Sequence, residues 1–524
     1  MIMNLNDLIL TIIREKVNSR HQLEKILRRY AQEKKIPIPK KYRLLRQYQK
    51  LLKRKQISKQ LGLEELLLAK PTRTLSGVTP LTVLVKPYPC PGECLYCPDQ
   101  AGIPKSYLAD EPAVLRAKKL RFDPKRQVDY RLKVFEMMGH RVSKIELIIL
   151  GGSFSFYPKN YRKQFIKACF DACNQTHSRS LSEAQRLNEE SKRRIVGLTI
   201  ETRPDLINKS EIRFLRQLGI TRVELGVQSL YFSVLKKIKR GHGLKEVVSA
   251  TRLLKDAGFK VCYHLMPGLP GSSYIKDIAM FKYIFKNCSF RPDFLKIYPC
   301  VVLKEAPLYQ DWLLGNFKPL KDKELVDLLV EIKKVIPPYV RINRLGRDIP
   351  VSNVVAGYRY SHIREVVQKK LKKQKFSCQC IRCREIRERD FENKNLRLKI
   401  IRYLASDSEE FFLQFIDPRN RLFAFLRLRL PGKKSKSLFP VLDDAALIRE
   451  LHTYGQSLSI GERKKRTSQH RGLGKRLLEE AEKISRQNGF SKIAVIAGVG
   501  VRDYYRSLGY NLKQTYMIKN LLRS

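Results

Sequence analysis

Residues 81–97 read LTVLVKPYPCPGECLYC, an apolar run followed closely by three cysteines. The run is rich in Leu and Val, which predicts a buried strand with Cys90, Cys94 and Cys97 on the loop after it. Five further apolar runs follow, each separated from the next by a longer basic amphipathic stretch: IELIILGG, IVGLTIE, RVELGV, VCYHLMPG and DFLKIYP. Continuous apolar strands that alternate with helices predict an α/β fold, a partial or complete parallel barrel with its chemistry at the C-terminal strand ends.

The composition favours a folded protein with a basic surface. The 524 residues include 105 Lys and Arg against 50 Asp and Glu, a formal net charge of +55, yet 43% are hydrophobic. Disorder would need this charge together with low hydrophobicity, so a folded chain with a phosphate-rich partner is expected. No apolar run approaches the ~18 residues of a membrane span, and residues 1–16 lack a signal-peptide cleavage site. These features predict a cytoplasmic protein with no membrane partner.

Four segments are expected along the chain. Residues 1–75 combine helical apolar spacing with Lys and Arg runs, which favours a basic helical segment that contacts nucleic acid over a merely solvated helix face. Residues 76–345 form the barrel, and residues 346–392 form a cysteine-bearing linker. Residues 393–524 begin with three expected antiparallel strands, LRLKIIRYL, FFLQFID and LFAFLRLRL. They continue through an exposed loop, GERKKRTSQ (461–469), to an amphipathic helix and the strand KIAVIAG.

The cysteines are bunched, which favours metal ligation over disulfide bridges in a reducing compartment. Cys90, Cys94 and Cys97 have the spacing C-x3-C-x2-C. Three thiolates can hold three irons of a 4Fe–4S cluster and leave the fourth iron open to another ligand. A structural zinc knuckle is the alternative, and it is less favoured because a closed zinc site normally needs four protein ligands.

Glycine and polar residues stand at the ends of the later apolar runs, where a barrel would present them to a ligand. Glycine permits a close approach of the backbone to that ligand. An ordinary turn is the alternative for the glycines, and a buried salt bridge is the alternative for the charged residues. The residues are Gly151, Gly152, Ser153, Glu201, Arg203, Glu224 and Gln228.

A second glycine-rich motif opens the amphipathic helix near the C-terminus. Gln469, Gly472 and Gly474 have the spacing Q-x-x-G-x-G directly before KRLLEEAEKI. Backbone amides at such a helix N-terminus bind anions and suit a pyrophosphate. The downstream strand and the pair Tyr504 and Tyr505 strengthen this interpretation over a simple glycine helix cap.

Together these motifs resemble known families. The cysteine loop resembles that of the radical S-adenosylmethionine (SAM) enzymes, and Q-x-x-G-x-G resembles the coenzyme A loop of GNAT-type acetyltransferases. The stretches KPYPCPGECLYCPD, IELIILGGSF, GLTIETRPD, RVELGVQS, MPGLPG, LKIYP, ALIRELHTYG and GVRDYYRSLGY resemble the catalytic third subunit of Elongator, in its prokaryotic type. The resemblance runs from about Lys70 to the C-terminus. It implies a radical SAM partial barrel, a GNAT-type domain and a helical basic N-terminal segment.

The resemblance also implies an activity, the formation of 5-carboxymethyluridine at the wobble position of tRNA. A 5′-deoxyadenosyl radical derived from SAM would take a hydrogen from the methyl group of acetyl-CoA, the carbon radical would add to uracil, and the thioester would be hydrolysed. An electron donor protein would reduce the 4Fe–4S cluster. Two rivals remain, a protein-lysine acetyltransferase with a regulatory barrel and a tRNA-binding scaffold without chemistry. The sequence leaves open whether the protein acts alone or as a homodimer.

Residue roles follow from the resemblance, motif by motif. Cys90, Cys94 and Cys97 would hold the cluster, and SAM would bind Gly151, Gly152, Ser153, Glu201, Arg203 and Gln228. Acetyl-CoA would contact Lys144 and the strand residues Glu450, Leu451, His452 and Thr453. Its pyrophosphate would bind Leu473, Gly474 and Lys475. Tyr505 would lie near the thioester as a catalytic hydrogen-bond donor, with Tyr504 as its structural neighbour.

The linker carries a second cysteine triplet, Cys378, Cys380 and Cys383, with the spacing C-x-C-x2-C. It resembles a zinc site between the two domains of some prokaryotic members. Zinc usually takes four ligands, and His362 is the nearest histidine, although the motif does not assign it. Three thiols without metal remain the alternative. Tyr88 departs from the family pattern, because many relatives have histidine there.

Overall fold

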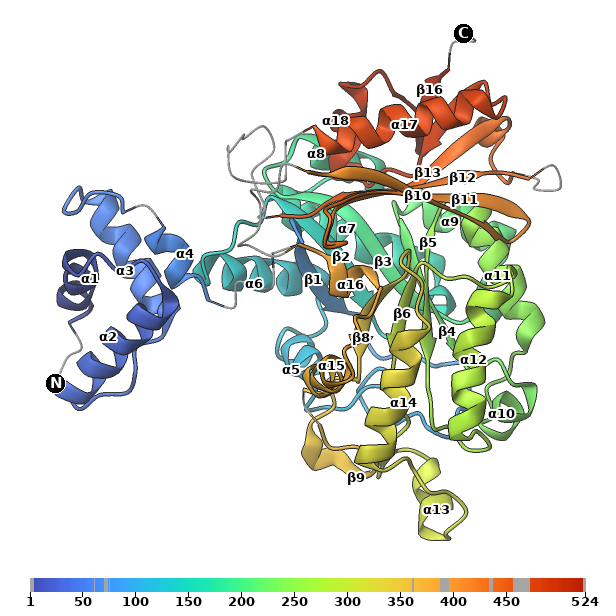
Figure 1. Cartoon of the computed structure of the whole chain (residues 1–524), viewed down its shortest axis with the longest axis horizontal. Helices are drawn as coiled ribbons and strands as arrows, with labels where there is room; N and C mark the ends of the chain where they lie inside the picture. Colours follow the sequence, from blue (N-terminus) through green and yellow to red (C-terminus); the bar gives the residue numbers. More distant parts are fainter. Residues whose placement is uncertain are drawn as a thin grey trace.

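The computed structural model describes residues 4–60, 62–69, 74, 76–360, 362–386, 395–432, 437–455 and 472–521. The predicted loop 461–469 and Gln469 of the second glycine motif lie outside these residues. Two seven-stranded sheets with helices around them form the body of the molecule, so the predicted α/β class is confirmed (Figure 1). In the described part of the chain, no helix has the length and apolar character that crossing a bilayer requires.

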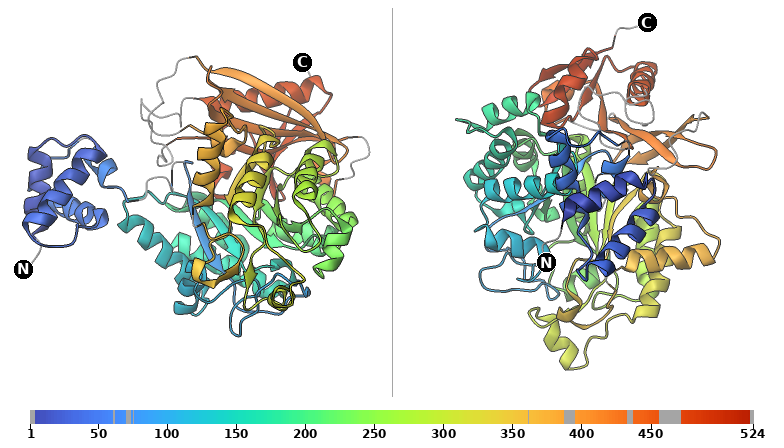
Figure 2. Two further views of the ribbon diagram at one scale, coloured as in Figure 1. Left: turned by 60° about the horizontal axis from the view of Figure 1, so that its bottom comes forward. Right: turned by 90° about the vertical axis from the view of Figure 1, so that its left-hand side faces the viewer.

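The N-terminal residues fold as a small helical module with its own apolar core. Its helices are α1 (Leu5–Arg14), α2 (Arg20–Glu33), α3 (Lys41–Lys53) and α4 (Leu63–Leu67). Apolar residues at helical spacing, such as Leu8, Leu23 and Leu44, are fully buried against one another, which leaves the Lys and Arg residues between them in solvent. The module stands to one side of the body in Figure 1 and in the left view of Figure 2, and it faces the viewer in the right view of Figure 2. The predicted basic helical segment is therefore present as a distinct unit.

The first sheet is the predicted partial barrel. Its strands are all parallel and follow the chain in order: β1 (Thr79–Leu84), β2 (Lys144–Leu150), β3 (Arg194–Thr202), β4 (Arg222–Gln228), β5 (Lys260–Leu265), β6 (Phe294–Ile297) and β8 (Arg341–Leu345). Six of these strands are the six apolar runs. The seventh, β8, has the sequence RINRL, and its polar residues prevent its identification as an apolar run. A short antiparallel pair, β7 (Val302–Leu303) and β9 (Val354–Ala356), lies outside the barrel sheet.

Helices cover the outside of the barrel, and the last two of them lie in the linker. They are α5 (Pro112–Lys119), α6 (Pro124–Met137), α7 (Lys159–Asn174), α8 (Leu181–Glu190), α9 (Lys209–Gln217), α10 (Phe232–Lys237), α11 (Leu244–Asp256), α12 (Tyr274–Lys286), α13 (Leu308–Leu313), α14 (Asp322–Lys334), α15 (Ile363–Lys373) and α16 (Ile381–Arg384). Side-chain caps begin several of them; Asn208, for example, accepts a hydrogen bond from the Glu211 amide at the start of α9. Most of the apolar helix faces share one hydrophobic core with the strands, whereas α10 and α13 pack in a second cluster and α5 packs in a third.

The second sheet lies above the barrel in Figure 1. Its strands are β10 (Arg397–Ala405), β11 (Ser408–Ile416), β12 (Leu422–Leu430), β13 (Ala445–Thr453), β14 (Lys492–Val495), β15 (Asn511–Lys513) and β16 (Tyr516–Asn520), with α17 (Leu473–Gln487) and α18 (Arg502–Arg506) beside them. The first three are the predicted antiparallel strands. β13 and β14 are parallel, and their pairing ends at Ile448 and Val495. The last residues of β13 therefore extend past β14 and open a gap at that edge.

A network of buried charges joins the two sheets. Asp293 precedes β6 in the barrel, and Arg449 lies on β13; Nη1 of the arginine is 3.0 Å from Oδ1 of the aspartate. Arg449 Nη1 also lies 2.7 Å from Oε2 of Glu410 on β11, and Lys255 of α11 lies 3.4 Å from Oε1 of the same carboxylate. None of these four side chains is exposed. Each domain thus supplies one partner of the ion pairs that join the two domains.

Candidate functional site

The predicted cysteine loop directly follows β1 and lines a small cavity. This cavity has a volume of about 110 Å³, and Cys90, Cys94 and Cys97 all face it. Cys90 Sγ lies 3.8 Å from the Ser153 hydroxyl, and Arg240 Nη1 donates a hydrogen bond of 3.3 Å to Cys94 Sγ. The donor set is therefore three thiols in a shared pocket with a buried guanidinium beside them, which suits an anionic iron–sulfur cluster.

Backbone hydrogen bonds hold the cysteine loop in place. The Leu95 amide donates to the Ile238 carbonyl at 3.1 Å, and the Leu308 amide donates to the Leu95 carbonyl at 2.8 Å. Gly92 allows a close contact, because a Cβ there would lie 2.2 Å from Nη1 of Arg203. The loop is thus fixed by segments that lie far from it in sequence.

The glycine turn after β2 has the form that the sequence predicts. Gly151 has a φ of +134° and Gly152 a φ of +80°, both in the region that favours glycine. A Cβ at Gly151 would also meet Cγ2 of Val85 at 2.1 Å. Gly151, Gly152 and Ser153 line the cysteine cavity, so this turn brings a bare backbone to the pocket.

Three buried polar atoms in the cysteine cavity have no hydrogen-bond partner among the described residues. They are Nη1 of Arg203, Oγ1 of Thr202 and Oε1 of Gln228. Gln228 also has a φ of +71°, a strained position for a residue with a side chain. Buried polar atoms normally find partners, so these three fit the amino, carboxylate and hydroxyl groups of SAM.

A chain of buried charges borders the same cavity. Glu201 accepts hydrogen bonds from the Tyr107 hydroxyl at 2.9 Å and from Lys296 Nζ at 3.0 Å. Lys296 also pairs with Glu224, whose Oε2 lies 3.0 Å from His264 Nε2. Glu201 therefore lines the cysteine cavity and also forms the buried salt bridge that was its alternative interpretation, and its role toward SAM stays a prediction.

The sequence did not single out Tyr107, His264 or Lys296. His264 and Lys296 lie inside β5 and β6, and their polar character in otherwise apolar strands was the available signal. Glu224, Cys262 and His264 place donor atoms within 4.8 Å of one another. The Lys296 ammonium already pairs with Glu224, so this group is an ion-pair network and not a metal centre.

A second, larger cavity of about 1410 Å³ lies between the barrel and the second sheet. The barrel contributes Lys144, Glu201 and Gln228 to its wall. Lys144 is assigned to acetyl-CoA, and the second domain contributes the other described residues with that assignment, together with Tyr504: Glu450, Leu451, His452, Thr453, Leu473, Gly474, Lys475 and Tyr505. Burial lowers the pKa of Lys144. The two predicted cofactor sites therefore open onto one cavity.

The start of α17 has the geometry of an anion site. Gly472 caps the helix with a φ of +76°, and Leu473, Gly474 and Lys475 form its first turn. A Cβ at Gly474 would lie 3.1 Å from the Tyr504 hydroxyl and 3.7 Å from Thr453 Oγ1. Free amides at this end of a 15-residue helix attract a pyrophosphate, and the missing side chain leaves it room.

The two tyrosines of α18 differ in their surroundings. Tyr504 is 41% exposed, and its hydroxyl is the one that lies over Gly474. Tyr505 is 5% exposed, packs against Tyr510 and has a pKa that burial raises far above its usual value. Both line the large cavity, so the catalytic role expected of Tyr505 stays a prediction and Tyr504 is the nearer of the two to the helix N-terminus.

Two strand residues assigned to acetyl-CoA are held by the protein itself. Glu450 accepts a hydrogen bond of 2.8 Å from Arg427 Nε. His452 Nε2 lies 2.9 Å from the Ser76 carbonyl, and its ring stacks on Phe425. Burial lowers the pKa of His452. Their side chains fix the strand, which leaves the backbone of β13 to face a ligand.

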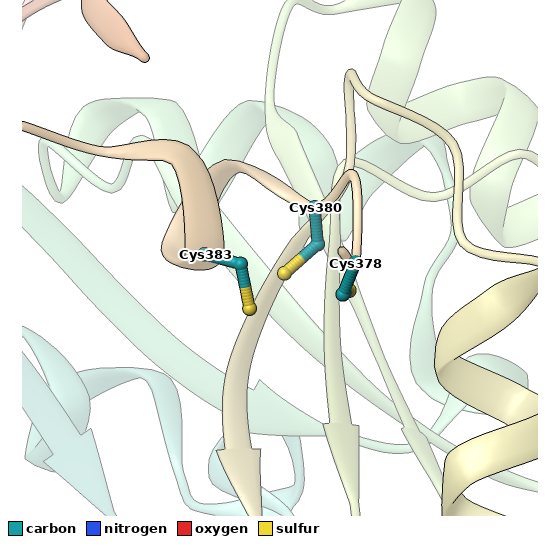
Figure 3. A group of neighbouring side chains, drawn as sticks. All are labelled: Cys378, Cys380 and Cys383. Atoms are coloured by element: carbon teal, nitrogen blue, oxygen red, sulfur yellow. The ribbon is translucent and has the colours of Figure 1, made fainter. Parts of the chain in front are cut away.

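The linker cysteines gather as the sequence predicts (Figure 3). The sulfur atoms of Cys378, Cys380 and Cys383 lie within 4.8 Å of one another. Nζ of Lys333 on α14 is 3.3 Å from Cys383 Sγ. His362 begins α15 and packs on Tyr360, and it does not belong to this group of donor atoms. The described residues therefore offer a metal three thiols.

Comparison with known proteins gives the family. Residues 88–282 match the Radical SAM superfamily, and residues 292–373 match the Radical_SAM C-terminal domain. A Dehalococcoides mccartyi protein named tRNA uridine(34) acetyltransferase is 45% identical over 86% of this chain and 99% of its own length. Human Elongator complex protein 3 is 38% identical over 86% of each chain. The chain belongs to the Elongator complex protein 3 family. A solved structure, archaeal Methanocaldococcus infernus Elp3 with an N-terminal deletion, is 41% identical, with a TM-score of 0.75 over 86% of this chain and all of that one.

Membership of the Elongator complex protein 3 family confirms the resemblance and the radical SAM fold. The radical SAM superfamily implies a 4Fe–4S cluster and SAM as cofactors, and the thiols and unpartnered polar atoms described above fit both. The C-terminal match ends at residue 373, inside the segment predicted as a linker. The predicted domain boundaries themselves stay predictions.

Proposed function

We propose that this protein forms 5-carboxymethyluridine at the wobble uridine of tRNA, with acetyl-CoA as the donor. The observation that carries the proposal is the single cavity of about 1410 Å³ whose wall includes both SAM-site and acetyl-CoA-site residues. A plain acetyltransferase needs no such connection, because its donor and acceptor meet without radical chemistry. A shared cavity lets an acetyl group bound at one domain be activated at the other.

In this proposal, residues of the two domains have separate binding roles. The cysteine loop holds the cluster, and Arg203, Thr202 and Gln228 bind SAM through their unpartnered atoms. When bound, the cluster and SAM supply hydrogen-atom abstraction from an unactivated carbon. The first turn of α17 holds the pyrophosphate, and β13 directs the pantetheine arm into the cavity.

A tRNA substrate is supported by charge and by the names of relatives. The +55 net charge favours a polyanion, and the helical module of residues 1–75 carries Lys and Arg on a surface that its own core does not use. Its relatives are named for tRNA uridine 34 and for Elongator. We therefore assign the module to tRNA binding, and an electron donor protein to reduction of the cluster.

The direct experiment is anaerobic incubation of the reconstituted protein with tRNA, methyl-labelled acetyl-CoA, SAM and dithionite, followed by mass spectrometry of digested nucleosides. We expect the label in 5-carboxymethyluridine. A labelled protein lysine with unlabelled tRNA would establish the protein-lysine acetyltransferase instead. Binding of tRNA with no label in either would point to a scaffold.

We also propose that Cys378, Cys380 and Cys383 hold a zinc ion. Three sulfur atoms within 4.8 Å, all on one short segment against α14, form the sulfur-rich donor set that zinc prefers. Elemental analysis of the purified protein should find about one zinc per chain, lost in Cys380→Ser. Cys288→Ser, outside the group, is the control. Equal zinc content in all three proteins would exclude the site.

A further inference from the structure

His264 lies on the wall that the two cavities share. It is on β5, its side chain is 12% exposed, and it lines both the cysteine cavity and the large cavity between the domains. The acetyl-CoA residues of β13, α17 and α18 line only the large cavity. His264 therefore stands at the end of the shared space where SAM binds and where the new carbon bond must form.

A buried carboxylate orients the imidazole. Nε2 of His264 is 3.0 Å from Oε2 of Glu224, whose side chain is fully buried. Burial alone would raise the pKa of Glu224, but Lys296 outweighs it and the pKa lies well below its usual range. A charged carboxylate can only accept a hydrogen bond, so the proton of a neutral imidazole is assigned to Nε2. Nδ1 then carries a lone pair.

The Nδ1 lone pair has no protein partner among the described residues. The ring meets Tyr298 edge-on at 5.5 Å between centroids, which fixes its plane without a hydrogen bond. The two carboxylates of the shared wall are engaged: Glu201 accepts from Tyr107 and from Lys296 of the large cavity, and Glu224 pairs with the same lysine. Among the described residues of this wall, His264 thus keeps a basic nitrogen that no ion pair occupies.

We propose that His264 is the base that removes the proton from carbon 5 of the substrate uracil. The proposal rests on the function proposed above. Addition of the acetyl-derived carbon forms a bond to carbon 5; the carbon 5–hydrogen bond then breaks, its proton goes to Nδ1, and one electron passes to an oxidised iron–sulfur cluster. The uracil double bond is restored. The resulting imidazolium faces the charged Glu224, which stabilises it as in a carboxylate–histidine pair.

Replacement by glutamine separates this role from a structural one. The introduced amide could still donate to Glu224 but could not take a proton, so His264→Gln should form 5′-deoxyadenosine within about threefold of the unsubstituted rate while 5-carboxymethyluridine falls by at least ~10²-fold. With tRNA deuterated at uracil carbon 5, product formation in the variant should become slower than with unlabelled tRNA. Cys288→Ser, at a cysteine outside both cavity walls, should keep both rates within about twofold. Equal loss of both products, or an unchanged rate, would overturn the proposal.

A further measurement does not depend on the variant rate. Nitrogen-15 NMR of labelled histidine, assigned through His264→Gln, should find the proton on Nε2. A proton on Nδ1 would overturn the proposal even if the enzyme is active.

The outcomes distinguish failure of the base assignment from failure of the proposed carboxymethyluridine-forming function. If the unsubstituted enzyme makes no labelled carboxymethyluridine, the proposed function fails and the base assignment fails with it. If the unsubstituted enzyme is active and His264→Gln keeps full product formation, only the base assignment fails.

Discussion

Arg449 and Asp293, 156 positions apart in the chain, form a buried pair that joins the two domains. Asp293 is three residues before Lys296, which pairs with Glu201 of the cysteine cavity, and Arg449 directly precedes Glu450, which lines the large cavity. The ion pair therefore sets the position of both halves of the site. Burial alone would raise the pKa of Asp293, but Arg449 outweighs it and holds the pKa well below the usual range.

Asp293→Asn should destabilise the protein strongly, because it leaves Arg449 and Lys255 without a full counter-charge in the interior. Breaking a buried pair from one side costs about 3–5 kcal/mol. The midpoint of denaturant unfolding, followed by circular dichroism, measures the effect. Arg402→Gln breaks an ion pair whose arginine is 64% exposed and should cost under about 1 kcal/mol. Equal midpoints for the two variants would contradict the role of the network.

Acidification should weaken the protein through the same carboxylates. The pKa values of Asp293 and Glu410 are lowered in the folded state, since their arginine partners outweigh burial. A carboxyl group whose pKa is lower in the folded state than in the unfolded chain stabilises the fold at pH values above its unfolded pKa of about 4. This contribution is lost as the pH falls below that value. The midpoint temperature of thermal unfolding, measured between pH 7 and 3, should therefore fall steeply below about pH 4. The drop should be smaller in Asp293→Asn.

Cys94→Ala should remove the cluster and leave tRNA binding intact. Cys94 is buried in the small cavity, whereas the basic helical module stands apart from it. Iron content and 5′-deoxyadenosine formation should fall to background after reconstitution. Cys288→Ser, distant from the loop in the chain, should retain both. Loss of tRNA binding in Cys94→Ala, measured by filter binding, would contradict the separation of the two roles.

The two tyrosines of α18 should affect different kinetic constants. The Tyr504 hydroxyl lies over Gly474 at the anion site, so Tyr504→Phe should raise the KM for acetyl-CoA by about tenfold. Tyr505, deeper in the wall, should act near the thioester, so Tyr505→Phe should lower kcat by about tenfold with little change in KM. Steady-state kinetics of carboxymethyluridine formation measure both. The reverse pattern would exchange the roles.

The basic module should bind tRNA in a salt-dependent way. Lys50 and Lys53 are exposed on the last turn of α3. Their replacement by Gln should lower the slope of log K against log salt by about 0.7–0.9 for each side chain that contacts a phosphate. The same change at Lys282 and Lys286, exposed on α12 on the far side of the body, should leave the slope unchanged. Equal slopes for both double variants would place tRNA elsewhere.

Motifs that follow apolar strands could be predicted from the sequence, because a parallel sheet gathers its strand ends at one edge. Cys90, Gly151 and Glu201 come together for this reason. β8 could not be predicted in the same way, since Arg341 and Asn343 face the large cavity and interrupt its apolar pattern.

His264 and Lys296 escaped prediction for a related reason, because they point inward from strands whose other residues are apolar. The interdomain network escaped it completely. Its charges come from segments between residues 255 and 449, and nothing local to Lys255, Glu410 or Arg449 distinguishes them from surface residues. Only their arrangement in the folded chain shows that they are fully buried.

The buried network also limits how this chain can be rearranged. A chain shortened to end at Leu345 would expose Asp293 and Lys255 to solvent and remove their ion-pair partners Arg449 and Glu410. A foreign acetyltransferase domain of similar shape, grafted in place of residues 395–521, would need a matching carboxylate and arginines at the same sites. The barrel accepts its neighbour by charge pattern, so the two halves are expected to be inherited and engineered as one unit.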